Sequence, residues 1–231
     1  RCANHGWHFD YGGSCKNAPA EQMFSVPALV RDGHLYADLP VVDRERVANA
    51  HSKRGPVSPC TIELHSHACL EIAYKGHSLL TDPWLVGPAL LGAWIQYPPP
   101  VVDVADLRPD ALWISHEHSD HFHEPTLELF DRSVPIFIPD FPNRRMVRRL
   151  TVMGFENIHP VRFGETYEIF DGLRLTSFET ATLWNDSITL FEIDGFRILN
   201  LNDAGLNPRI SQLIGPDDVV ASAFTGGASG Y

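Results

Sequence analysis

The chain has 231 residues, of which 44% are hydrophobic, and carries a formal net charge of −11 at pH 7. This length suits one large domain or a medium domain with a small one, and the negative charge disfavours sequence-independent binding of nucleic acid or of an anionic membrane. No run of eighteen apolar residues is present, which argues against a membrane span. The four cysteines are too few and too irregularly spaced for a disulfide scaffold, so we expect a reducing, cytoplasmic setting.

The first residues contain a pair of metal-ligating side chains. Cys2 and His5 form a Cys-x-x-His pair within "RCANHGWHFDYGGSC". This segment resembles the second ligand loop of a Rieske [2Fe-2S] domain, in which each of two loops gives one cysteine and one histidine. The resemblance implies that Cys2 and His5 bind the cluster and that the first Cys-x-His loop lies upstream of Arg1. We therefore expect the natural N-terminus to precede Arg1.

The next segments predict a hairpin and a linker. Residues 22–38 alternate apolar and polar positions around Asp32-Gly33, which is typical of a β-hairpin. The stretch 41–60 is charged and bounded by prolines without sustained periodicity, which is typical of a linker. We therefore predict three parts: residues 1–40 as the C-terminal part of a Rieske domain, 41–60 as a linker, and 61–231 as a larger domain.

Short strand candidates dominate the larger domain. They are broken by turns such as Asp171-Gly172 and Asp194-Gly195, and they cover residues 61–74, 77–82, 111–115, 134–140, 166–178, 187–203 and 217–224. Helices are predicted at residues 124–130, 143–154 and 207–215. Sheets covered by helices place the domain in the α/β or α+β class.

Residues 115–122, "SHEHSDHF", concentrate metal ligands directly after the apolar run "ALWI". His116 and His118 are two residues apart, so in an extended segment they project to the same side and can bind one metal ion. Asp120 and His121 then point the other way, so one loop can serve two neighbouring metal positions, with a carboxylate to hold or deprotonate water. A histidine-rich surface loop is the alternative, but five ligand-capable residues at this spacing favour a metal site.

Residues 116–121, "HEHSDH", match the His-x-His-x-Asp-His signature of the metallo-β-lactamase fold. This resemblance implies an αββα sandwich, with Asp82 near the metal loop and Asp203 as the aspartate that bridges the metals. In this fold a further ligand histidine follows a later strand and another lies near the end, but "SFETATLWNDS" contains none and none follows Asp203. We therefore expect a single metal ion on His116, His118 and a carboxylate, and we expect the domain to continue past Tyr231.

A Rieske centre moves single electrons, which a β-lactamase-type hydrolase does not need, so the two motifs together indicate redox chemistry at the second metal. The chain resembles the CMP-N-acetylneuraminate hydroxylase family, with "DPWLVGPA" and "GGASG" as its more specific segments. The resemblance implies a Rieske-type non-haem iron monooxygenase that hydroxylates the N-acetyl group of a CMP-sialic acid with O2. Its electrons would come from a cytochrome b5-type or ferredoxin-type donor. Candidate ligands of the catalytic metal are then His116, His118, Asp120, His121 and Asp203, of which His116, His118 and Asp120 are also the catalytic candidates.

Two other functions remain open at this point. The motifs also fit a metal-dependent hydrolase of the phosphodiesterase or lactonase kind, with zinc in place of iron, and a non-enzymatic electron-transfer or binding module fits the missing histidine. Gly226, Gly227 and Ser229 either offer backbone N–H groups to a nucleotide-sugar-like substrate or form a flexible turn. A linker of this length spans about 25 Å as a coil, so the cluster can serve the metal within one chain or across a homo-oligomer.

Overall fold

The computed structural model describes residues 28–31, 34–37, 60–96, 99–180, 186–194, 196–204 and 219–222. The chain divides into two compact units, and strands β3 to β13 all belong to the unit Arg54–Ala223. In the other unit, β1 (Ala28–Arg31) and β2 (His34–Ala37) pair antiparallel with Arg31 opposite His34, which confirms the predicted hairpin. The predicted cluster ligands Cys2 and His5 and residues 41–59 of the predicted linker lie outside the described residues, so the cluster, the linker and the domain division stay predictions.

Six strands form the first sheet, in the order β3-β4-β5-β6-β7-β8. Their bounds are β3 (Thr61–Ser66), β4 (Cys69–Tyr74), β5 (His77–Thr81), β6 (Ala111–Trp113), β7 (Ile136–Pro139) and β8 (Ile158–Val161). Strands β3 to β5 are antiparallel hairpins, whereas β5 to β8 run parallel and need crossover connections. These connections contain η1 (Leu90–Gly92), η2 (Val104–Asp106), α2 (Glu124–Leu127) and α3 (Arg145–Val152). None of the described helices is long and apolar enough to cross a membrane.

The second sheet has the order β13-β12-β11-β10-β9. Its strands are β9 (Thr166–Phe170), β10 (Leu173–Glu179), β11 (Ser187–Ile193), β12 (Phe196–Asn200) and β13 (Val219–Ala221). Strands β9 to β12 pair antiparallel through the hairpins predicted at Asp171-Gly172 and Asp194-Gly195, and β13 joins β12 in parallel. The predicted strands are thus confirmed in type and order, except that residues 61–74 form the two strands β3 and β4, and β8 was not predicted.

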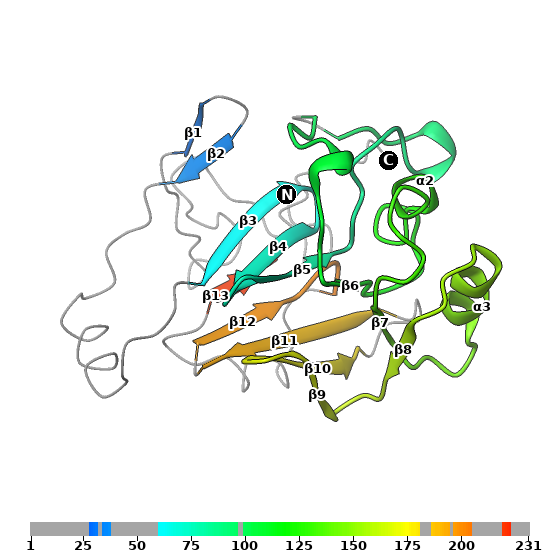
Figure 1. Cartoon of the computed structure of the whole chain (residues 1–231). Helices are drawn as coiled ribbons and strands as arrows, with labels where there is room; N and C mark the ends of the chain where they lie inside the picture. Colours follow the sequence, from blue (N-terminus) through cyan, green and yellow to red (C-terminus); the bar gives the residue numbers. More distant parts are fainter. Residues whose placement is uncertain are drawn as a thin grey trace, which may run out of the picture. The chain divides into compact units, whose positions relative to one another are not determined.

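The two sheets pack face to face, with α2 and α3 on the outer face of the first sheet (Figure 1). Strand β6 contributes to both interfaces, because Leu112 belongs to the buried cluster that includes residues of the helices, while its neighbour Trp113 belongs to the cluster that includes Leu175 and Phe191 of the second sheet. This alternation explains why a central parallel strand is apolar at every position. The layered metallo-β-lactamase-like sandwich is confirmed, and the helix predicted at 207–215 lies outside the described residues.

At Gly172, in the turn between β9 and β10, the second sheet comes close to the first. Its φ is +87°, a backbone conformation that disfavours any side chain, and a Cβ there would lie 2.7 Å from Cε1 of the buried Tyr74. Tyr74 also donates a hydrogen bond to Asp194, so its ring is held between the two sheets.

We expect Gly172→Ala to lower the free energy of unfolding by about 2–4 kcal/mol, because backbone strain adds to overpacking against Tyr74. Gly164→Ala is the matched control, since its φ is +78° but no atom lies within 4 Å of an added Cβ. Its cost should be about 1–2 kcal/mol from the backbone alone. Urea denaturation of both variants measures the difference, and equal losses would contradict a rigid contact at Tyr74.

Candidate metal centre

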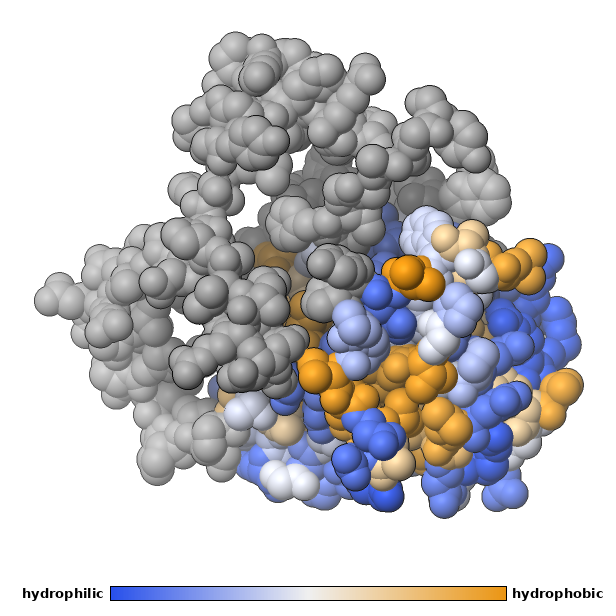
Figure 2. All heavy atoms as spheres, turned by 90° about the horizontal axis from the view of Figure 1, so that it is seen from above, coloured by the Kyte–Doolittle hydropathy of each residue, from blue (hydrophilic) through white to orange (hydrophobic). Residues whose placement is uncertain are grey.

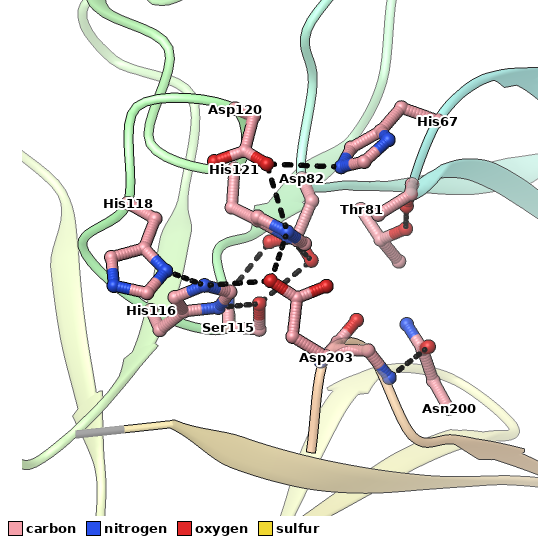
Figure 3. Close-up of polar contacts among 12 residues, drawn as sticks. His67, Thr81, Asp82, Ser115, His116, His118, Asp120, His121, Asn200 and Asp203 are labelled. Atoms are coloured by element: carbon pink, nitrogen blue, oxygen red, sulfur yellow. Dashed lines mark hydrogen bonds and ion pairs between the residues drawn. The ribbon is translucent and has the colours of Figure 1, made fainter. Parts of the chain in front are cut away.

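Polar side chains from four connections meet at one place in the larger unit (Figure 3). Asp82 follows β5, the segment Ser115–His121 follows β6, Asp203 follows β12, and His67 lies in the turn between β3 and β4. Strands β5 and β6 are parallel neighbours with Thr81 opposite Trp113, so their carboxyl ends bring Asp82 beside Ser115. The site therefore depends on the order of the strands as well as on the motif.

Asp82 organises the metal loop. Its carboxylate is fully buried and accepts hydrogen bonds from Ser115 N at 2.7 Å, Ser115 Oγ at 2.7 Å and His121 Nδ1 at 3.0 Å. A carboxylate that accepts from the Nδ1–H of a histidine fixes the ring and directs Nε2 toward the metal position. Thr81, the last residue of β5, donates from Oγ1 to Ala68 O at 2.8 Å and accepts from Leu70 N at 3.0 Å, which holds the turn that carries His67.

His116 is held as a neutral imidazole. Ser115 Oγ donates its only proton to Asp82, so it accepts from His116 Nδ1 at 2.9 Å, and the lone pair of His116 is left on Nε2. That Nε2 atom lies 3.0 Å from His118 Nδ1 and 3.7 Å from Asp203 Oδ2. Burial, with help from the charge on His121, lowers the pKa of His116 to about 3. His116 is thus in the form that binds a metal.

His121 carries the opposite charge state in the metal-free protein. Its Nε2 atom lies 3.4 Å from Asp203 Oδ2 and 3.9 Å from Asp120 Oδ2. Burial opposes protonation, but Asp82 and Asp203 outweigh it and raise the pKa of His121 to about 10. Burial likewise opposes ionisation of Asp203, yet His121 and His116 lower the pKa of that carboxyl to about 2. A metal ion that binds here must displace the proton on His121.

His67 and Asp120 complete the cluster. His67 Nε2 lies 3.3 Å from Asp120 Oδ2, and the His67 ring meets the rings of His121 and Trp84 edge-on at centroid distances of 5.1 and 5.3 Å. Burial raises the pKa of Asp120, but His67 and His121 lower it more, so the carboxyl stays ionised.

Within this centre, two sets of three side chains place their ligand atoms within 4.8 Å of one another: His116, His121 and Asp203, and His67, Asp120 and His121. Each set has two imidazoles and one carboxylate, which suits iron or zinc. The Nε2 atoms of His67 and His121 are buried without a hydrogen-bond partner, as expected for nitrogens that bind a metal. The residues present therefore fit the metal that the motif predicts.

An apolar loop borders the metal loop. Figure 2 shows apolar residues exposed among hydrophilic ones on the face seen from above. In the connection between β5 and β6, the side chains of Leu91, Ile95 and Val101 are exposed, and Leu90 N donates to Ser119 Oγ of the metal loop at 2.9 Å. This hydrogen bond joins the connection that carries the exposed apolar side chains to the metal loop.

The structure brings together all five predicted ligands, and their ligand roles stay predictions. His118 lies beside His116, as their spacing suggested, although it falls outside both three-residue sets. Sequence reasoning missed two neighbours: His67 and Asp186, whose Oδ1 lies 3.5 Å from His116 Nδ1. A histidine at the tip of a tight hairpin, where glycine or asparagine is usual, was the available signal for His67. Gly226, Gly227 and Ser229 lie outside the described residues and stay predictions.

We expect Asp82→Asn to weaken metal binding by about 10–100-fold, because the buried charge that orients His121 is lost. Asp110→Asn is the matched control, since Asp110 accepts from Ser78 N on a part-exposed surface and touches no member of the centre. Competition with a chromophoric chelator measures both affinities. Equal affinity for the two variants would contradict the role of Asp82.

Metal affinity should rise with pH. Because the pKa of His121 is raised to about 10, its proton competes with the metal at neutral pH and is lost only as pH rises toward that value. We expect the apparent affinity to increase about tenfold per pH unit between about pH 7 and pH 9, with one proton released per metal bound. Calorimetry in buffers of different ionisation enthalpy counts that proton. An affinity that does not change over this range would contradict a protonated His121.

Known proteins share the fold of the larger unit. The model of a beta-lactamase superfamily domain matches residues 61–227. The cytidine monophosphate-N-acetylneuraminic acid hydroxylase of Asterias rubens is 32% identical over 243 residues, which cover 100% of this chain and 37% of that protein. The chain therefore spans little more than a third of the length of this relative.

Two solved structures of a beta-hydroxylase are also similar. A mutant of CmlA beta-hydroxylase is 25% identical with a TM-score of 0.54, over 78% of this chain and 38% of that one. CmlA itself, described as a diiron beta-hydroxylase from Streptomyces venezuelae, is 24% identical with the same TM-score, over 78% of this chain and 37% of its own. With its paired sheets and its His-x-His-x-Asp-His loop at the strand ends, the chain belongs to the beta-lactamase superfamily.

Proposed function

We propose that this chain is part of a metal-dependent hydroxylase that inserts oxygen into the N-acetyl group of a CMP-sialic acid or a related nucleotide-sugar substrate. The observation that carries the proposal is the buried set of His116, His121 and Asp203, since two histidines and one carboxylate are the ligands of many non-haem Fe(II) oxygenases. The relative from Asterias rubens, which matches the full length of the chain, supports the substrate class by its name.

The proposed reaction needs electrons as well as oxygen. Each hydroxylated methyl group consumes one O2, two electrons and two protons, and the second oxygen atom leaves as water. Iron bound at the centre supplies the activation of dioxygen. We propose that a cytochrome b5-type or ferredoxin-type donor delivers the electrons through a Rieske [2Fe-2S] cluster that Cys2 and His5 help to bind. The described cysteines Cys60 and Cys69 are free thiols, which suits the cytoplasm as the place of reaction.

The surrounding side chains hold the ligands and can exchange protons. Asp82 and Ser115 fix the rings of His121 and His116, so both Nε2 atoms face the same region. Asp186 Oδ1 lies 3.5 Å from His116 Nδ1, and burial raises the pKa of Asp186 to about 7. Its carboxyl can therefore take up or release a proton beside the centre near neutral pH.

Two hydrogen bonds also connect the metal loop to the second sheet and to the residue before Asp203. Ser187 Oγ donates to Ser115 O at 2.8 Å, and Asn202 Nδ2 donates to Ser187 O at 3.2 Å. These buried bonds connect the metal loop to the start of β11 and to the residue before Asp203. The ligands from the two sheets are thus held at fixed separations, which the positioning of a substrate requires.

The test uses full-length protein with substrate, reductant and ¹⁸O2. We expect one ¹⁸O atom in the product, and we expect His116→Ala to reduce turnover by more than about 100-fold, because loss of a ligand costs more than loss of an outer partner. His77→Ala, a partly exposed histidine beside Asp110, is the control and should keep its activity.

Product labelled from H2¹⁸O, formed without reductant or O2, would contradict the proposal and would instead support a metal-dependent hydrolase. The same isotope comparison therefore separates the two enzyme classes in one experiment.

A further inference from the structure

We propose that Arg149 of α3 is a positioning residue of the metal centre, which anchors the metal loop from the side of the helix and thereby orients His118. This inference goes beyond the proposed function, because it concerns how the loop presents a ligand and not which reaction the metal serves. It also gives a role to a helix in which no ligand was predicted.

The hydrogen bonds of Asp82 reach two of the three histidines in the loop. They fix His121 directly and His116 through Ser115. In the described part of the chain, the ring of His118 makes one hydrogen bond, from Nδ1 to His116 Nε2 at 3.0 Å (Figure 3). A metal ion on His116 takes the lone pair of that Nε2 atom, so the bond cannot orient His118 in the loaded centre. The orientation of His118 then depends on its backbone.

Arg149 contacts this backbone and the residues that follow it. Its Nη1 atom donates to the carbonyl oxygen of Glu117, which directly precedes His118, at 3.2 Å. Its Nε atom donates to Oε1 of Glu124 at 2.9 Å, and its Cζ atom lies 4.0 Å from the ring centroid of Phe122. One side chain of α3 thus spans the whole segment from Glu117 to Glu124.

The turn after His118 transmits this anchor. The carbonyl oxygen of His118 accepts hydrogen bonds from the backbone N of His121 at 3.0 Å and from that of Phe122 at 2.7 Å. Phe122 is fully buried, with the guanidinium of Arg149 over its ring. Both ends of the turn that begins at His118 are therefore held by the same arginine.

The contacts require the shape of arginine. A planar guanidinium can donate in two directions while its face lies on an aromatic ring, whereas the ammonium group of lysine has no such face. Arg145, one turn earlier in α3, also lies near the loop, with Nη1 at 3.2 Å from Glu117 Oε1. Its side chain is 62% exposed against 35% for Arg149, so we expect it to contribute less.

The experiment measures Co²⁺ binding to full-length protein without oxygen. Arg149→Met keeps an unbranched chain beside Phe122 and removes every N–H donor. We expect it to weaken Co²⁺ binding by about tenfold, the lower end of what the loss of an outer partner costs. We also expect an altered visible absorption spectrum of the bound cobalt and, in the metal-free protein, faster amide hydrogen exchange in residues 117–122.

Arg148→Met is the matched control, because Arg148 is exposed on the same helix. It should keep the affinity, the cobalt spectrum and the exchange rates of wild type. Arg149→Lys keeps the charge and should fold, yet it should still weaken Co²⁺ binding, because one ammonium cannot replace both hydrogen bonds and the ring contact.

Wild-type affinity and a wild-type cobalt spectrum in Arg149→Met would overturn the proposal, even in a protein that unfolds more easily, since Arg149 would then serve stability alone. If Arg149→Met does not fold, the same two measurements on Arg149→Lys decide, and wild-type values there would overturn the proposal too. None of these measurements uses substrate or oxygen, so the proposed function can fail while this inference holds, and the reverse.

Discussion

The buried carboxylate of Asp82 is the interaction on which the rest of the centre depends. An ionised carboxylate in a protein interior is costly unless hydrogen bonds compensate for the lost water, and Asp82 accepts three of them, from Ser115 N, Ser115 Oγ and His121 Nδ1. Those same bonds set the orientation of His121 directly and of His116 through Ser115. Its neighbour Thr81 fixes the turn that carries His67, so one dipeptide at the end of β5 positions both halves of the cluster.

The second constraint is the packing of the two sheets. Asp203 follows β12 of the second sheet, and one buried apolar cluster holds that sheet against the first, with Trp113 of β6, Phe191 of β11 and Ile198 of β12 among its members. The hydrogen bond from Tyr74 to Asp194 connects β4 of the first sheet to the β11–β12 hairpin of the second. A centre built from both sheets can therefore form only in the folded domain, and metal binding should stabilise that fold.

The sequence predicted those features that depend on local pattern. Alternating and apolar runs located the strands, Asp-Gly pairs located the hairpins, and the spacing within "HEHSDH" located the metal loop. The helix predicted at 124–130 is shorter in the structure, where α2 ends at Leu127. After Leu127 the backbone bonds change to a three-residue spacing, from Leu129 N to Thr126 O and from Phe130 N to Leu127 O. The guanidinium of Arg132 also donates to the carbonyl oxygens of Leu127, Glu128 and Phe130.

The features that were missed depend on contacts between distant segments. His67 is one residue in a strand-rich stretch, and only the register of β3 with β4 and the anchor at Thr81 bring it beside Asp120. Asp186 directly precedes β11, and nothing in its sequence neighbours marks it as close to His116. The expectation of one metal ion followed from a search for histidines at the positions usual in the metallo-β-lactamase fold, and it stays a prediction.

The central claim is that the ends of β5, β6 and β12 form one iron centre. Anomalous diffraction at the iron edge, from crystals of protein loaded with Fe²⁺ without oxygen, tests it most directly. The account predicts an anomalous peak about 2.1 Å from His116 Nε2 and within bonding distance of Asp203. A folded protein with no anomalous peak at this position would contradict it.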